Sequence, residues 1–91
     1  MAKTVHLTIT GKVQGVGYRD SMRLEALRAG CSGWVRNRRQ GSVEAVVEGP
    51  SESVDWVVEW ARRGPAAARV DDVVVSPAKG GHTGFEVLRN A

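Results

Sequence analysis

The spacing of apolar residues along this chain switches repeatedly between the two-residue repeat of a β-strand and the repeat of about 3.6 residues of an α-helix. In residues 4–10, Val5, Leu7 and Ile9 alternate with polar side chains, which predicts a strand with one buried face and one face in water. Alternating or valine-rich stretches predict further strands at 33–38, 43–48, 70–76 and, for a short last strand, 85–88.

Two segments have helical periodicity. Residues 20–29 contain good helix formers and place Met22 and Ala26 on one face. Residues 52–63 carry an apolar stripe made of Val54, Val57, Val58 and Ala61. The order β-α-β-β-α-β with a short extra C-terminal strand predicts an α+β, ferredoxin-like fold, in which two helices cover one face of a mostly antiparallel sheet.

Composition narrows the setting. The 91 residues suffice for one core, so we expect a single domain over 1–91. The net charge of +3 is too small to indicate nucleic acid and suits a small anion equally well. One cysteine favours a reducing compartment, and no apolar run reaches the length of a signal peptide or membrane span. We therefore expect a cytoplasmic monomer without membrane contact.

The residues that join the first strand to the first helix, 11–19, read Gly-Lys-Val-Gln-Gly-Val-Gly-Tyr-Arg. Gly15 and Gly17 allow backbone angles in which successive N–H groups converge on one anion. The helix that follows adds its positive N-terminal end. Arg19 adds a planar guanidinium that suits phosphate oxygens. The loop is therefore predicted to hold one terminal phosphate group.

Other phosphate and metal motifs do not match. A nucleotide P-loop ends in Gly-Lys-Ser/Thr, whereas Gly17 is followed by Tyr18 and Arg19. A dinucleotide fingerprint needs a small residue where this chain has Asp20. No group of His, Cys, Asp and Glu has metal-ligand spacing, so the sequence predicts neither a metal nor a cofactor.

Two stretches resemble the acylphosphatase family. Residues 11–19 resemble its signature, with Tyr18 where Phe is commoner, and Gly33-Trp34-Val35-Arg36-Asn37 resembles its second signature. Smaller matches extend the similarity over nearly the whole chain, at Gly41-x-Val43-Glu44, Glu48-Gly49, Gly64-Pro65 and Thr83-Gly84-Phe85-Glu86.

The resemblance implies hydrolysis of the carboxyl–phosphate bond of an acyl phosphate to a carboxylate and inorganic phosphate. It implies that Arg19 binds the phosphoryl group and that Asn37 orients the attacking water. The backbone amides implied to hold the phosphate oxygens are those of Gln14, Gly15, Val16, Gly17, Tyr18 and Arg19. Phosphoryl transfer depends mainly on positioning and charge stabilisation, so these groups could replace a metal ion and the reaction is expected to be metal-independent.

Two other functions are compatible with parts of the pattern. A non-catalytic module that binds acyl or carbamoyl phosphate could keep the same loop. An RNA-binding domain of the RRM type shares the element order, but it needs exposed aromatic residues on its central strands, and residues 42–48 contain none.

The remaining reactive side chains are expected to be structural or exposed. His6 and His82 have no carboxylate near them in sequence and are predicted to be surface histidines. Cys31 is predicted to be a small buried apolar residue. Asp20 is predicted to favour the start of the first helix and to point to solvent.

Overall fold

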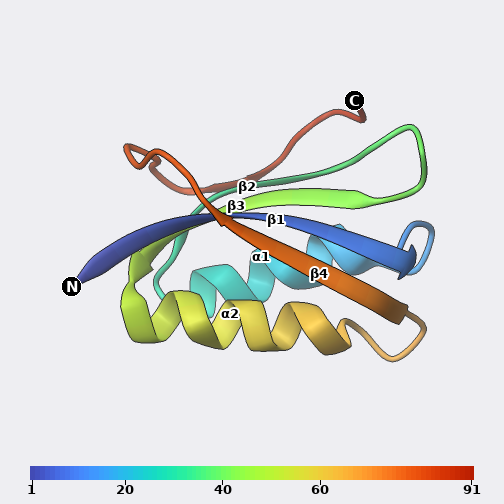
Figure 1. The fold of residues 1–91 in the computed structure, drawn as a ribbon, viewed down its shortest axis with the longest axis horizontal. Coiled ribbons are helices and arrows are strands. Elements are labelled where there is room, and N and C mark those ends of the chain that lie inside the picture. Colours follow the sequence, from blue (N-terminus) through green and yellow to red (C-terminus); the bar gives the residue numbers. More distant parts are fainter.

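The computed structural model describes residues 1–91. Its elements follow in the order β1 (Ala2–Lys12), α1 (Tyr18–Arg28), β2 (Ser32–Asn37), β3 (Val43–Pro50), α2 (Ser51–Arg63), β4 (Arg69–Pro77) and β5 (Phe85–Val87). The strands form one sheet in the order β4-β1-β3-β2-β5, and both helices lie on the same side of it (Figure 1). The predicted ferredoxin-like βαββαβ order with an extra C-terminal strand is confirmed.

The sheet is mixed. Strand β1 is antiparallel to both β3 and β4, and β2 is antiparallel to β3. After β4 the chain reverses and crosses to the opposite edge, where β5 runs parallel to β2 and pairs Phe85 with Gly33. The segment after β5 continues along the same edge, since the Leu88 N–H donates to the Val35 carbonyl at 2.9 Å.

One face of the sheet, which we call the covered face, packs against the helices. The register places Leu7 opposite Ala45 and Ile9 opposite Val43, so these side chains share that face. From the helices the core receives Tyr18, Met22, Ala26, Val54, Val57 and Ala61. The alternation predicted for residues 4–10 therefore follows from the helices covering one side only.

The opposite face, which we call the open face, carries the polar residues of the alternating strands. His6 and Thr8 lie there, as predicted, with Glu44 opposite Thr8 on β3. Val46 also lies on this face and yet is only 5% exposed. It sits opposite His6 on one side and opposite Trp34 on the other, and these larger side chains flank it in the register.

The boundaries near the glycine loop differ from those predicted. Strand β1 runs on to Lys12, and α1 begins at Tyr18 instead of at residue 20. Gly17 starts the helix in the left-handed region, with φ of 77°. Arg19 therefore belongs to the first helical turn and not to the loop. Neither helix has both the length and the apolar character that a membrane-crossing helix requires.

Candidate active site

The loop from Val13 to Gly17 turns the chain from β1 into α1. Gly15 and Gly17 both have positive φ, at 72° and 77°, which residues with a Cβ rarely adopt. None of the backbone N–H groups from Gln14 to Asp20 donates a hydrogen bond within the chain. A curved loop of free N–H groups that leads into a helix start is a binding geometry for an anion.

The start of α1 is held in place from the covered face. The Tyr18 side chain is 1% exposed, and its hydroxyl donates to the Ala61 carbonyl on α2 at 2.7 Å. Its ring also packs against Trp60, with centroids 5.3 Å apart. Burial raises the pKa of Tyr18 well above its ordinary value. The Tyr18 side chain is therefore a core anchor that ties the start of α1 to α2.

A cavity of about 230 Å³ opens at this loop. It is lined by Val13, Gly15, Gly17, Tyr18, Arg19, Asp20 and Asn37. Arg19 from α1 and Asn37 from the end of β2, which the sequence singles out separately, thus line one cavity. A larger hollow of about 470 Å³ lies between the helices beside Trp56, but no glycine and no asparagine line it.

Asn37 is 7% exposed, and its Oδ1 is buried without a hydrogen-bond partner. It is the last residue of β2 and lies opposite Val43, so its position is fixed by the strand ladder. Its backbone carbonyl accepts from the Ala91 N–H at 2.9 Å. A buried polar atom without a partner is uncommon, and a bound water or ligand is one explanation for it.

Arg19 and Asp20 stand at the mouth of the cavity. Arg19 is half-buried and its Nη1 donates to Asn90 Oδ1 at 3.3 Å. Neither Arg19 nor Asp20 takes part in an ion pair. Asp20 is exposed, as predicted, and also lines the cavity beside the guanidinium. The residues that line the cavity therefore include one cation and one carboxylate, neither of which forms an ion pair.

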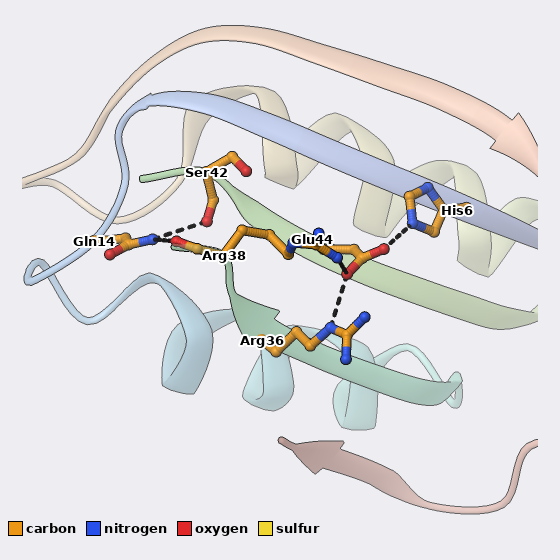
Figure 2. Close-up of polar contacts among 6 residues, drawn as sticks. All are labelled: His6, Gln14, Arg36, Arg38, Ser42 and Glu44. Carbon is orange, nitrogen blue, oxygen red and sulfur yellow. Dashed lines mark hydrogen bonds and ion pairs between the residues drawn. The ribbon is translucent and has the colours of Figure 1, made fainter. Parts of the chain in front are cut away.

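Gln14 has a role that the sequence did not indicate. Its side-chain Nε2 donates to the backbone carbonyls of Arg38 at 2.7 Å and Ser42 at 2.9 Å (Figure 2). Arg38 directly follows Asn37 at the end of β2, and Ser42 directly precedes β3, so the two acceptors lie on either side of the β2–β3 turn. The sequence predicts a role only for the backbone amide of Gln14, because side-chain contacts across 24 and 28 residues depend on the tertiary packing.

The open face carries a charge cluster around Glu44, shown in Figure 2. His6 Nε2 lies 2.6 Å from one carboxylate oxygen, while Arg36 Nε and Arg38 Nη1 lie 2.8 and 3.0 Å from the other. Burial alone would raise the pKa of Glu44, but hydrogen bonds from His6, Arg36 and Arg38 outweigh it and lower the pKa to about 2. Arg36 also stacks over Trp34, 5.0 Å from the ring centroid.

The structure defines the surroundings of His6 and Cys31. His6 pairs with Glu44, a carboxylate on the neighbouring strand that is 38 residues away in the sequence. Cys31 is buried, as predicted, and burial raises the pKa of its thiol. No group of three or more His, Cys, Asp and Glu side chains is arranged to hold a metal ion.

Comparison with known proteins agrees with this geometry. The sequence profile of the family named Acylphosphatase matches residues 5–87. An acylphosphatase from Thiobacillus denitrificans is 56% identical over 84 residues, which cover 92% of this chain and 94% of that relative. One from Rubrobacter xylanophilus is 53% identical and covers 93% and 79% of the two chains. The solved structure of an acylphosphatase from Coxiella burnetii superposes with a TM-score of 0.92 at 35% identity, covering 96% and 93%. This chain therefore belongs to the acylphosphatase family.

Proposed function

We propose that this protein is an acylphosphatase that hydrolyses the carboxyl–phosphate bond of acyl phosphates at the cavity lined by Arg19 and Asn37. One observation carries the assignment. Free backbone N–H groups, a guanidinium without an ion-pair partner and the side-chain amide of Asn37, whose Oδ1 has no hydrogen-bond partner, line one cavity. The N–H groups and the guanidinium are suited to donate to a phosphoryl group, and the amide oxygen is suited to accept from the water that attacks it.

In this proposal the loop binds the phosphoryl group of the substrate. The backbone N–H groups from Gln14 to Arg19 donate to its oxygens, and the Arg19 guanidinium pairs with the same oxygens. These donors are fixed before the substrate arrives, so they can stabilise charge in the transition state without rearranging. The exposed Asp20 carboxylate opposes this field from the mouth of the cavity.

Asn37 then orients the nucleophile. Its Oδ1 accepts a hydrogen from a water molecule, whose oxygen attacks phosphorus in line with the acyl oxygen. The new P–O bond forms as the bond between phosphorus and the acyl oxygen breaks. The carboxylate leaves with the electron pair, and the proton of the water ends on the released phosphate. A carboxylate is a good leaving group, so no general acid is required.

The assignment is tested by following benzoyl phosphate hydrolysis after treatment with a chelator. We expect metal-independent turnover and competitive inhibition by inorganic phosphate. Arg19→Gln should lower kcat/KM by at least about 1,000-fold, because it removes the charge that binds and stabilises the phosphoryl group. Asn37→Ala should lower kcat by at least about 100-fold while inorganic phosphate still binds.

The same assay separates this function from a module that only binds acyl or carbamoyl phosphate. Such a module would bind inorganic phosphate at the loop but would not turn the substrate over. If both variants are folded, as judged by circular dichroism, and turn over the substrate normally, the proposed site is wrong. We further propose that the protein is a monomer, which sedimentation in the presence of inorganic phosphate tests. We also propose a reducing compartment, which the single cysteine favours.

A further inference from the structure

The proposed site is divided between two parts of the chain. The phosphate-binding N–H groups and Arg19 belong to the loop and the first turn of α1, whereas Asn37 ends β2. The two hydrogen bonds from the Gln14 side chain are the only hydrogen bonds that join the loop residues 13–17 to the β2–β3 hairpin. The two parts of the site are therefore connected directly through one side-chain amide.

The acceptors of these hydrogen bonds belong to a rigid piece of backbone. The Arg38 N–H donates to the Ser42 carbonyl at 2.8 Å, and the Gly41 N–H donates to the Arg38 carbonyl at 3.1 Å. The turn of the hairpin therefore has backbone hydrogen bonds of its own, which do not depend on Gln14. Asn37 precedes Arg38 in the chain, so a group that holds the Arg38 carbonyl also limits where Asn37 can move.

The contact requires a side chain that can donate two hydrogen bonds. A side-chain NH₂ group has two hydrogens, and here each hydrogen faces one carbonyl oxygen. An ionised carboxylate at the same place would meet two oxygens and be repelled. An apolar side chain of the same length would leave both carbonyl contacts unmade. Gln14 is only partly buried, so losing these hydrogen bonds is not expected to disrupt the hydrophobic core.

We propose that the Gln14 side chain is a positioning residue, which sets the distance between the phosphoryl group held by the loop and the water held by Asn37. This inference rests on the proposed function. It assigns to Gln14 two separate contributions, a backbone N–H toward phosphate and a side chain toward the hairpin. Near-attack geometry is sensitive to displacements of about 1 Å, which can cost about 100-fold in rate.

The first test replaces the amide by an apolar side chain of similar length. Gln14→Met should lower kcat for benzoyl phosphate by about 10- to 100-fold. KM and the inhibition constant of inorganic phosphate should change by less than about threefold, since the loop N–H groups and Arg19 remain. Gln40→Met is the matched control, because Gln40 is exposed at the same hairpin and its side chain makes no hydrogen bond.

A double-mutant cycle separates positioning from general support of the fold. If Gln14 acts through Asn37, then Gln14→Met added to Asn37→Ala should lower kcat by less than about twofold more. A loss in the double variant equal to the product of the two single losses would overturn the inference. A rise in KM with kcat retained would do the same, because it would assign Gln14 to substrate binding alone.

A second variant covers the case in which Gln14→Met does not fold. Gln14→Glu keeps the size of the side chain, and its protonated form can still donate one hydrogen bond. The ratio of its kcat to that of the wild type should rise as the pH falls through the range in which this carboxyl group protonates. A ratio that is constant with pH would contradict the inference. Failure of the wild type to hydrolyse benzoyl phosphate would instead reject the proposed function.

Discussion

The two faces of the sheet are stabilised by different interactions. The covered face is apolar and closed, with Leu7, Ile9 and Val43 at 0% exposure beneath the helices. The open face has no layer over it, and its central feature is the Glu44 carboxylate shared by His6 and two arginines. Adjacent residues of a single strand therefore experience nearly opposite environments.

This difference matters for the site because both faces reach it. The covered face fixes Tyr18 through the Ala61 carbonyl and so fixes the helix start that carries Arg19. The open face holds Arg38 against Glu44, one residue after Asn37. Apolar packing depends little on salt and pH, whereas ion pairs depend on both. The two halves of the proposed site should therefore respond differently to solution conditions.

The largest difference is expected between two neighbouring residues of β1. Leu7→Ala should lower the free energy of unfolding by about 3 kcal/mol, because it removes a buried side chain and leaves a cavity. Thr8→Ala, on the open face, should change it by less than about 0.5 kcal/mol. Urea unfolding of both variants measures this directly. Equal losses would mean that the open face is packed as tightly as the covered one.

Acid should weaken the open face selectively. The pKa of Glu44 is lowered from its ordinary value of 4.5 to about 2 in the folded protein. The stability from this carboxylate is therefore present above about pH 4.5 and is lost as the pH falls toward 2. With allowance for its 15% side-chain exposure, we expect the Glu44 carboxylate to contribute about 2 kcal/mol to the free energy of unfolding at neutral pH.

The measurement compares wild type and Glu44→Gln by urea unfolding between pH 7 and pH 2. The stability gap should close toward the acid end, and high salt should narrow it at pH 7. Glu86→Gln is the control, since Glu86 is exposed on β5 and has no ion pair. A gap that stays constant from pH 7 to pH 2 would show that the charge of Glu44 contributes nothing.

On the covered face, Tyr18→Phe isolates one buried hydrogen bond. The variant loses the hydroxyl that donates to the Ala61 carbonyl, and we expect a loss of about 1 kcal/mol in the free energy of unfolding. Turnover of benzoyl phosphate should stay within about twofold, because the Tyr18 hydroxyl is bound to α2 and the backbone of the loop is unchanged. A large loss of turnover with stability retained would mean that the hydroxyl acts in the reaction.

The smallest effect concerns a charge that belongs to neither face. Asp20→Asn removes the free carboxylate at the cavity mouth and should tighten inhibition by inorganic phosphate by about two- to fivefold, less at high salt. Asp72→Asn removes an equally exposed, unpaired carboxylate on β4 and serves as control. Equal effects of the two variants would show that only net charge matters.

Much of the fold could be predicted because its signals are local. Alternation over residues 4–10 and the apolar stripe beginning at Val54 depend on neighbours in sequence, and both are seen in the structure. The start of α1 was predicted two residues late. The sequence places Tyr18 in the loop, because nothing near it in the chain reveals that its hydroxyl bonds to Ala61, 43 residues away.

For the candidate site, the two short motifs predict Arg19 and Asn37, and the structure places both in the lining of one cavity. Their roles in the reaction remain predictions. The Gln14 contact to the hairpin and the pairing of His6 with Glu44 could not be predicted, because they depend on how distant segments pack. The β1–β3 register pairs Glu44 with Thr8, two residues from His6 on the same face of the sheet, so the two side chains are diagonal neighbours.

Gly17 begins α1 without any side chain that could accept from the first N–H groups of the helix. An anion bound in the cavity would accept from these N–H groups in place of a helix cap, so anion binding would stabilise the folded state. A ligand that binds only the folded chain at about 100 times its dissociation constant adds about 2.7 kcal/mol of stability. The product, inorganic phosphate, would then both inhibit turnover and protect the folded enzyme from unfolding.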